Sequence, residues 1–420
     1  METKYLACLE ISTHSIKMLI GYELSGRPVP LYSKAVPLKP GTIKAGVVAD
    51  PNALVAALSS FREIEDEKER LKLSIDRLHL VIPPLGLKVY QSEKNTLVVR
   101  DDGTIEELDI SNLISLVKKE AIPGGNTIVD IIPAIFQLDN GQRYANPPLG
   151  QKSRSISVRA MIHTLPESNA NLYQTLANSA GFRVRKSAIS VYCASYYFRS
   201  VKSLPSSYIL VDIGYESTDV ALIGEGMPYG ATSFFQGGKD LTAAIAEGFG
   251  IPFAEAEQIK IRHGYDPRLI SYKPPIASSS DGQGKRQEYR QHDLNFLIEN
   301  YFSSFAPSLS NALATIVAKQ ASQFAELPVL VTGGGSELFG IEGFLKKAFP
   351  KREILFPRPN VIGAREPGLV NLLGLLLAGS RYSGSLEDNY RGMASITRVA
   401  DGKKPPKRRE RGSYAEEDVL

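Results

Sequence analysis

The sequence predicts an α/β protein of two lobes, and three observations support this prediction. A buried strand that ends in an acidic residue begins each half of the chain, at Glu10 and at Asp212. In both halves, two further strands and the start of a helix follow, which suggests one β-β-β-helix unit used twice. Between the two units, residues 85–160 have the pattern of a small α+β insert. Two copies alone do not establish a duplication, because β-hairpins are common.

Length, charge and cysteine content exclude several classes of protein. The 420 residues suffice for two to three domains, and the net charge of +4 is too weak for a nucleic-acid-binding body. The two cysteines, Cys8 and Cys193, exclude a disulfide framework and a multi-cysteine zinc site. We find no signal peptide, and the apolar stretch 368–379 is about half the ~20 residues of a membrane helix. We expect a cytoplasmic protein in which this stretch is a buried core helix.

The first lobe is predicted to begin with strands at 5–10, 16–22 and 31–36. A helix then begins at Pro51, with Asp50 as its N-cap, and fades into a charged run near Arg70. In the insert we expect strands at 89–100, 128–138 and 156–163, and a helix at about 112–120 capped by Asp109 or Ser111. A helix at 168–180 returns the chain to the first lobe.

The second lobe is predicted to repeat the opening pattern. Strands are expected at 209–211, 219–223 and 231–235, and a helix begins at Gly237-Gly238. A polar loop at 274–290, a long helix at 293–321 and a strand at 329–332 follow. The predicted domains are a first lobe at 1–84 and 161–205, an insert at 85–160, a second lobe at 206–379 and a flexible tail at 380–420.

The acid-ended strands are candidate phosphate and metal sites. A carboxylate at the end of a buried strand can hold Mg²⁺, while backbone N–H groups of the following small-residue turn face phosphate oxygens. Two such turns facing each other would clamp a phosphate, at residues 10–13 and 212–219. Alternatively, Asp212 and Asp219 only terminate strands. Gly333, Gly334 and Gly335 let backbone approach a ring or a phosphate, or else form a tight turn.

Other catalytic chemistry has no pattern in the sequence. The five histidines have no metal-ligand spacing, and neither a nucleophile elbow nor a Walker-type loop occurs. Cys193 lies in an apolar aromatic run, which is typical of a buried inert thiol.

Together these motifs resemble the actin-type ATPase superfamily and, within it, the bacterial cell-division family FtsA. The resemblance covers 5 to about 379. In the first half it rests on Leu9-Glu10-Ile11-Ser12-Thr13, Gly46-Val47-Val48-Ala49-Asp50, Asp130-Ile131-Ile132-Pro133 and Asn146-Pro147-Pro148-Leu149-Gly150. In the second half it rests on Val211-Asp212-Ile213-Gly214 through Thr218-Asp219, Gly237-Gly238, Ala256-Glu257-Gln258-Ile259-Lys260 with Gly264, and Thr332-Gly333-Gly334-Gly335.

The resemblance implies a two-lobed actin-like (ribonuclease-H-like, duplicated) α/β fold with ATP and Mg²⁺ between the lobes. It implies a metal at Glu10 and Asp212, no identified catalytic residue, and at most slow ATP hydrolysis. The implied nucleotide-binding residues are Glu10, Ser12, Thr13, Asp212, Gly214, Ser217, Thr218, Asp219, Gly237, Gly238, Glu257, Lys260, Gly333, Gly334, Gly335 and Ser336.

The same resemblance implies a division protein that links filaments of the tubulin-like protein FtsZ to the cytoplasmic membrane face at the division site. It would also recruit septum proteins and associate with itself into filaments. The acidic FtsZ tail would dock on the second lobe, where Lys285, Arg286 and Arg290 supply positive charge.

The sequence departs from the family pattern at three places. Tyr215 and Glu216 replace glycines of the second phosphate motif, and Ser12 replaces a glycine of the first. A carboxylate beside a phosphate would repel it, so ATP binding is expected to be altered or lost. No C-terminal amphipathic helix is visible. A basic run could contact an anionic membrane weakly, or it is only a solvated tail: Lys403, Lys404, Lys407, Arg408, Arg409 and Arg411.

Two other functions stay open. One is a nucleotide-free adaptor similar to the actin homologues of pilus assembly, which Tyr215 and Glu216 favour. The other is a small-molecule kinase of the same superfamily, which is disfavoured because we locate no catalytic Asp in a first-lobe substrate site.

Overall fold

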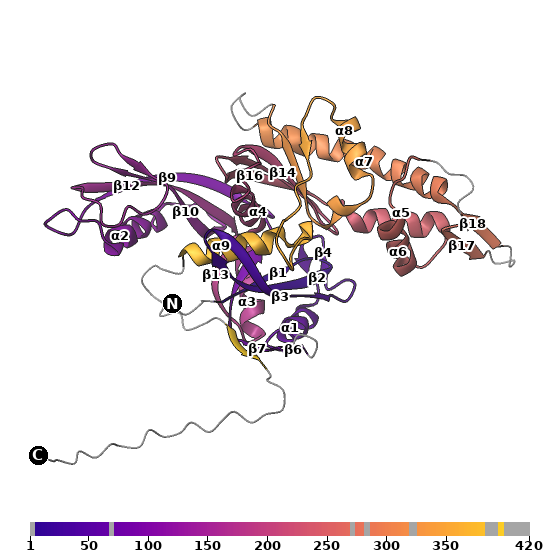
Figure 1. Ribbon diagram of the computed structural model, residues 1–420, viewed down its shortest axis with the longest axis horizontal. Coiled ribbons are helices and arrows are strands. Elements are labelled where there is room, and N and C mark those ends of the chain that lie inside the picture. Colours follow the sequence, from indigo (N-terminus) through magenta and orange to yellow (C-terminus); the bar gives the residue numbers. More distant parts are fainter. Residues whose placement is uncertain are drawn as a thin grey trace, which may run out of the picture.

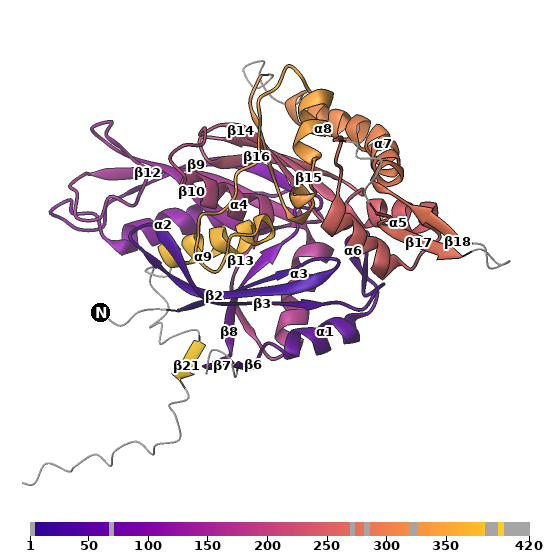
Figure 2. The ribbon, with the colours of Figure 1, turned by 45° about the vertical axis from the view of Figure 1, so that its right-hand side comes forward.

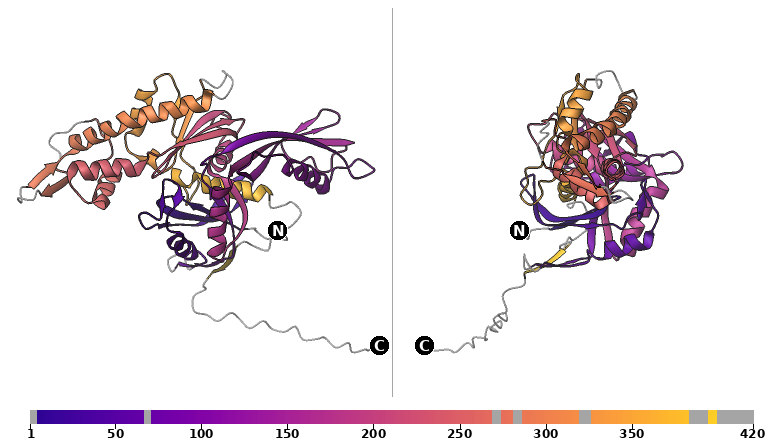
Figure 3. Two further views of the ribbon diagram at one scale, coloured as in Figure 1. Left: turned by 180° about the vertical axis from the view of Figure 1, so that it is seen from behind. Right: turned by 90° about the vertical axis from the view of Figure 1, so that its right-hand side faces the viewer.

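The structure is a computed structural model that describes residues 5–66, 71–268, 274–280, 286–318, 326–382 and 394–398. The second lobe and the insert extend to opposite sides of the molecule, and the first lobe lies below and between them (Figures 1 and 3). Helix α9 (Val370–Tyr382) crosses the middle of the molecule (Figure 2).

The first lobe is a five-stranded sheet in the order β13-β8-β1-β2-β3. Its strands are β1 (Leu6–Ile11), β2 (Ser15–Leu24), β3 (Arg27–Pro37), β8 (Arg77–Ile82) and β13 (Arg183–Ile189). The first three are antiparallel, as the sequence predicts, whereas β8 and β13 are parallel to β1. The turn between β1 and β2 is therefore at one end of the central strand.

Helix α1 (Pro51–Ser59) confirms the predicted cap, because the Asp50 side chain accepts a hydrogen bond from the Ala53 N–H at 2.9 Å. The expected fading of this helix toward Arg70 is wrong. The helix ends at Ser59, and β6 (Glu63–Asp66) pairs with β7 (Leu71–Ile75) instead. Upstream, β4 (Ile43–Lys44) and β5 (Val47–Val48) form a hairpin whose tip is Ala45-Gly46.

The insert has its own sheet, in the order β11-β10-β12-β9, covered by α2 (Glu107–Lys118). Its strands are β9 (Lys88–Leu97), β10 (Asn126–Leu138), β11 (Arg143–Tyr144) and β12 (Ser155–Pro166). The predicted start of α2 near residue 112 is wrong by about a turn. Asp109 lies inside the first turn and accepts a hydrogen bond from the N–H of the N-cap Glu106 at 2.8 Å. An acid at this position therefore caps from within the helix.

The second lobe repeats the sheet of the first, in the order β16-β15-β14-β19-β20. Three antiparallel strands, β14 (Tyr208–Ile213), β15 (Thr218–Gly224) and β16 (Met227–Phe234), are joined by parallel β19 (Val329–Thr332) and β20 (Ile354–Leu355). Its helices are α5 (Gly238–Phe249), α6 (Phe253–His263), α7 (Gln291–Ala318) and α8 (Ile341–Ala348). The common strand order confirms the predicted repeat.

Two predictions for the loops and the tail need correction. The expected polar loop at 274–290 contains a hairpin of β17 (Ala277–Ser280) and β18 (Arg286–Tyr289). Within the expected flexible tail, β21 (Ala394–Arg398) pairs antiparallel with β7. β17 and β18 lack the apolar alternation by which strands are identified in a sequence, and β21 shows it over five residues only.

Helix α9 is the buried core helix that the apolar stretch predicts, and it packs against α4 (Ser190–Arg199). The two helices cross so closely that a Cβ added at Gly374 would lie 1.7 Å from the Cys193 carbonyl oxygen. Cys193 is fully buried, as expected. Around this crossing, one hydrophobic core runs from the first-lobe sheet to β14 and β15 of the second lobe. None of the helices in the described part of the chain is long and apolar enough to cross a bilayer.

Candidate functional site

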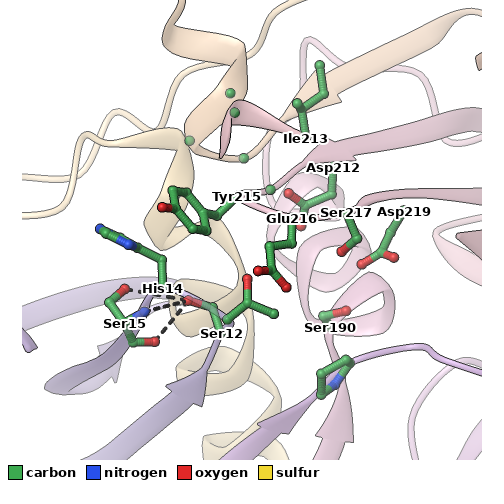
Figure 4. Close-up of a pocket in the computed structure, with 18 of the residues that line it drawn as sticks. Ser12, His14, Ser15, Ser190, Asp212, Ile213, Tyr215, Glu216, Ser217 and Asp219 are labelled. Atoms are coloured by element: carbon green, nitrogen blue, oxygen red, sulfur yellow. Dashed lines mark hydrogen bonds between the residues drawn. The ribbon is translucent and has the colours of Figure 1, made fainter. Parts of the chain in front are cut away.

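A cleft of about 430 Å³ lies between the two lobes, where the turns after β1 and β14 face each other. Figure 4 shows both turns, with Ser12 and His14 opposite Tyr215 and Glu216. The repeated sheets place these turns at the same end of each central strand. The central helices α4 and α9 pack together in the hydrophobic core that both lobes share. Two motifs more than 200 residues apart in sequence therefore form one site.

Carboxylates from both lobes meet at the floor of the cleft. The Asn371 side-chain amide, on the first turn of α9, donates to Glu10 Oε1 at 2.7 Å and contacts Asp212 Oδ2 at 3.3 Å. Lys17 Nζ lies 3.6 Å from Glu10 Oε2 and donates to the Gly368 carbonyl at 2.8 Å. A single amide therefore bridges one acid of each lobe.

Burial raises the pKa values of Asp212 and Asp219. It raises the pKa of Asp212 to about 6, with a further contribution from the negative charge of Glu10. It raises the pKa of Asp219 to about 7, with Asp212 adding to the effect, although Ser233 Oγ donates to Asp219 Oδ1 at 2.6 Å. Asp219 is the cross-strand partner of Asp212. A cation in the cleft would relieve this repulsion.

The donor set at the floor fits a hard divalent cation. Mg²⁺ is usually held by one or two carboxylates, with waters and substrate phosphates completing its shell. Glu10 and Asp212 supply two such carboxylates, and Glu10 Oε2 is a buried oxygen that has no hydrogen-bond partner. A cluster of three or more acidic, histidine or cysteine ligands does not occur among the described residues, so the protein alone would not enclose the ion.

The glycines after β19 serve mainly the close approach of two turns. A Cβ at Gly333, where φ is +84°, would lie 2.2 Å from Asp212 Oδ1, and one at Gly335 would lie 2.3 Å from the Ile213 side chain. At Gly334 no atom would lie within 4 Å. Two of the three glycines are thus required by packing on β14, and Gly334 alone borders open space.

The predicted acid and lysine of α6 line the cleft, but they contact each other and α5. Lys260 Nζ donates to Glu257 Oε2 at 2.8 Å, to Thr242 Oγ1 at 2.8 Å and to the Gly238 carbonyl at 3.0 Å. Burial lowers the pKa of Lys260. The pair therefore joins α6 to the first turn of α5 and presents a polar wall to the cleft.

Side chains of the two turns also connect the lobes directly. Glu216 Oε2 accepts a hydrogen bond from the Ala45 N–H of the first lobe at 3.0 Å. Its Oε1 accepts one from Lys239 Nζ at 2.5 Å. The rings of His14 and Tyr215 lie 4.3 Å apart with an interplanar angle of 33°. We call these five residues the interlobe clasp; Figure 4 shows three of them.

The structure brings most of the predicted nucleotide residues together around the cleft: Glu10, Ser12, Thr13, Asp212, Gly214, Ser217, Asp219, Gly238, Glu257, Lys260, Gly333, Gly334 and Gly335. Thr218 and Ser336 do not line it. Thr218 Oγ1 donates to the Gln236 carbonyl at 2.8 Å, and Ser336 Oγ to the Gly333 carbonyl at 2.7 Å. Gly237 does not line the cleft either. Its Cα packs against the Tyr215 backbone, since a Cβ there would lie 2.6 Å from the Tyr215 carbonyl oxygen.

Sequence reasoning missed Lys17 and Asn371. Each is a polar residue in an apolar stretch, Lys17 in β2 and Asn371 in α9. A polar side chain within a predicted core element needs a buried partner. That signal was present in the sequence, but it does not say which partner the fold supplies.

The predicted partner and membrane residues lie elsewhere. Arg286 is an exposed residue of β18, and Arg290 directly precedes α7. A groove of about 630 Å³ lies nearby, between α5, β18 and α7. Lys285 lies outside the described residues, as do the basic residues predicted to contact membrane: Lys403, Lys404, Lys407, Arg408, Arg409 and Arg411.

The repeated sheets, the central helices and the interlobe cleft define a two-lobed actin-like protein. Solved structures of the same fold include the PilM-PilN type IV pilus biogenesis complex, with a TM-score of 0.55, 17% identity and coverage of 89% of this chain and 98% of that chain. Another is MreB5 of Spiroplasma citri bound to AMPPNP, with a TM-score of 0.50, 14% identity and coverage of 89% and 95%.

The family models and curated relatives are more specific. The model described as "Cell division protein FtsA" matches residues 209–374, and "SHS2 domain inserted in FTSA" matches 87–164. FtsA of Enterococcus hirae is 23% identical over 386 residues, covering 91% of this chain and 84% of its own. FtsA of Escherichia coli K12 is 21% identical over 407 residues, covering 94% and 95%. This chain belongs to the FtsA family, and it is an actin-like cell-division protein.

Proposed function

We propose that this chain is an adaptor that links FtsZ filaments to the cytoplasmic face of the membrane and recruits septum proteins. In this proposal it holds ATP or ADP with Mg²⁺ between its lobes, hydrolyses ATP slowly at most, and associates with itself into filaments. The observation that carries the proposal is the SHS2-type insert of 87–164 on a two-lobed actin-like body. MreB5, which shares the fold, is described as bound to AMPPNP.

Different residues of the cleft would contact the metal, the phosphates and the nucleoside. Glu10 and Asp212 would hold Mg²⁺, which screens the negative charge of the phosphates when it is bound. The turns beginning at Ser12 and Gly214 would approach the phosphates with backbone N–H groups. The polar wall of Glu257 and Lys260 would face the nucleoside. Asn371 would orient both metal-binding carboxylates, since its amide already contacts each of them.

The groove on the second lobe supports the predicted docking of an acidic FtsZ tail. Its lining includes Phe249, Tyr289 and Phe296, and Phe296 is 62% exposed. Arg286 and Arg290 flank this lining in sequence and would attract an acidic segment. The lining also includes the acids Asp293 and Glu299, so the positive charge for an acidic segment would come from Arg286 and Arg290 beside the groove, and the aromatic residues would take its apolar side chains.

Co-sedimentation with vesicles tests the whole proposal. FtsZ filaments are mixed with vesicles of anionic lipid, with and without the chain, and the pelleted FtsZ is measured. We expect FtsZ to pellet only with the chain. Reversal of Lys285, Arg286 and Arg290 to Glu should lower the pelleted FtsZ by about tenfold or more while the chain still pellets. Removal of residues 403–420 should release both proteins. Unchanged FtsZ recovery by the reversed variant in low salt would contradict the docking site.

A nucleotide-free adaptor is the second candidate. The interlobe clasp favours it, because Glu216 and Tyr215 contact Ala45 and His14 of the first lobe directly. A ligand at 100 times its Kd would stabilise the native state by about 2.7 kcal/mol. The same melting temperature with and without millimolar Mg·ATP and Mg·ADP would therefore favour this second candidate.

A further inference from the structure

The Glu216 carboxylate is a built-in anion between the two lobes. Its side chain is only 11% exposed, so solvent screens its charge weakly. One oxygen accepts the Ala45 N–H across the cleft, and the other accepts Lys239 Nζ from the first turn of α5. Figure 4 shows the carboxylate pointing from the second-lobe turn toward Ser12 of the first.

These contacts are the ones that a phosphate oxygen would make. A phosphate between two such turns is bound by backbone N–H groups and by a lysine, usually beside a helix N-terminus. Here one backbone N–H and one lysine at the start of α5 are already paired with a carboxylate. A second anion at this place would lose both donors and would lie beside a like charge in a weakly screened site.

The first-lobe hairpin is shaped to present that N–H. Ala45 and Gly46 both have positive φ, 46° and 76°, which is the two-residue hairpin turn between β4 and β5. Alanine is unfavourable in this conformation, and a conformation of this kind persists only where surrounding contacts hold it. The hydrogen bond to Glu216 is one such contact.

The other part of the clasp, Tyr215 and His14, fills space in the cleft and does not occupy hydrogen-bond donors. Tyr215 occupies a position where a glycine would leave the cleft open, and its ring packs at a tilt against that of His14. Burial lowers the pKa of His14, so at neutral pH the ring carries no charge that could attract an additional phosphate. The floor with Glu10 and Asp212 is not occupied by the clasp and still lines the cleft.

We propose that Glu216 takes the place of a terminal phosphate, so that the cleft binds nucleoside diphosphates in preference to triphosphates. This inference rests on the proposed nucleotide site. A diphosphate has one phosphate and one charge fewer, so it can occupy the floor beside Mg²⁺ while the clasp stays closed. A triphosphate must displace Glu216 from Ala45 and Lys239.

Titration calorimetry with Mg·ADP and with a non-hydrolysable Mg·ATP analogue tests this inference. The proteins are the wild type, Glu216→Gln, which keeps the shape and removes the charge, and Glu216→Gly, which also restores space. Glu255→Gln is the matched control, because Glu255 is an exposed carboxylate of α6 that does not line the cleft. Melting temperatures confirm that each variant is folded.

We expect the wild type and Glu255→Gln to bind the diphosphate about tenfold more tightly than the triphosphate analogue. Glu216→Gln should bring the two affinities within about threefold, and Glu216→Gly should favour the triphosphate analogue. A wild type that binds the analogue as tightly as the diphosphate overturns the inference and leaves the nucleotide site intact. A Glu216→Gln variant that keeps the full preference for the diphosphate also overturns the inference and leaves the nucleotide site intact.

Two further outcomes separate this inference from the proposed function. If no variant binds either nucleotide, the proposed nucleotide site fails, and this inference fails with it. If only the Glu216 variants bind nucleotide, the carboxylate excludes both ligands, and the diphosphate preference is wrong although the cleft is a nucleotide site. The vesicle experiment tests the adaptor function independently of all these results.

Discussion

At the scale of single residues, the raised pKa values of Asp212 and Asp219 mean that these acids lower the stability of the fold at neutral pH. Asp219 is half-buried beside Asp212, and its pKa is raised to about 7. A carboxyl group whose pKa is higher in the folded than in the unfolded state binds its proton more tightly when folded. Stability is therefore lost as pH rises from the unfolded pKa near 4 through the folded pKa near 7.

Asp219→Asn should raise the free energy of unfolding at pH 7.5 by about 1–3 kcal/mol, since one pKa unit corresponds to about 1.4 kcal/mol. Asparagine keeps an oxygen that can accept from Ser233 and removes the charge. The gain should shrink toward zero near pH 4, where both proteins are neutral at this position. Urea unfolding at pH 4, 5, 6 and 7.5 measures it. A gain that does not depend on pH would contradict the assigned ionisation.

The acids could be found from sequence, whereas their partners could not. Glu10 and Asp212 each end an apolar strand, and this local pattern is visible without a structure. Asn371 meets them only because α9 returns, more than 150 residues after Asp212, to the space between the lobes. Its role depends on tertiary placement, which no local pattern contains.

At the scale of elements, the crossing of α4 and α9 holds the lobes together. Gly374 brings the two helices into contact at the Cys193 carbonyl. The contact lies within the core shared by both lobes. Cores are packed at crystal-like density, so an added methyl group cannot be absorbed here without moving a helix.

Gly374→Ala should lower the free energy of unfolding by about 3 kcal/mol, because the new methyl group forces the helices apart. Gly343→Ala is the matched control, since Gly343 lies in α8 and a Cβ there would meet nothing within 4 Å. Alanine is favoured over glycine in an open helix by about 1 kcal/mol, so the control should be stabilised. Chemical unfolding of both variants measures the two effects. Equal effects at the two positions would contradict the close crossing.

Elements with an apolar period were predictable, and polar ones were not. β1, β14 and α9 carry continuous apolar runs and were expected at nearly their observed places. The parallel strands β8, β13 and β20 of the two sheets were not predicted. The hairpin of β17 and β18 reads as Ala-Ser-Ser-Ser and Arg-Gln-Glu-Tyr, a composition that fits a loop equally well. It is a strand pair because α5 and α7 provide a surface for Tyr289 to stack on Phe249.

At the scale of the whole molecule, the insert has a core of its own. Residues of α2, β10 and β12 form a hydrophobic cluster separate from the clusters of the two lobes, with Phe136 fully buried at its centre. Regions with separate cores can open separately, with free energies below that of global unfolding. Because Ile132 of β10 and Leu165 of β12 belong to the core of the first lobe, we expect only the outer part of the insert, around Phe136, to open separately.

Phe136→Ala should destabilise the insert by about 3–5 kcal/mol, the usual cost of removing a buried aromatic ring. Hydrogen exchange should accelerate in peptides covering β9, β10 and β12, while peptides of β14 and β19 stay protected. Leu108→Ala, at an exposed leucine of α2, is the matched control and should change little. Equal acceleration in both lobes would show that the insert and the lobes unfold as one unit.

The repeat of the lobes was visible in the sequence as two acid-ended strands, and the common strand order confirms it. The clasp was not visible in this way. The departures at Tyr215 and Glu216 suggested a weakened phosphate site, but their partners His14 and Ala45 lie in the other lobe. Which residues meet across a cleft depends on how two rigid bodies are placed.

The clasp also decides what kind of signal the cleft can transmit. Its groups belong to one chain, so their effective concentration is fixed and their contact does not depend on the level of any solute. A ligand shifts a conformational equilibrium only by its difference in affinity for the two states. In a protein already held closed, a diphosphate that fits beneath the clasp changes that equilibrium little. The lobes would then keep one arrangement as a diphosphate binds and leaves, and only a triphosphate, which must displace Glu216 from Ala45 and Lys239, would change it.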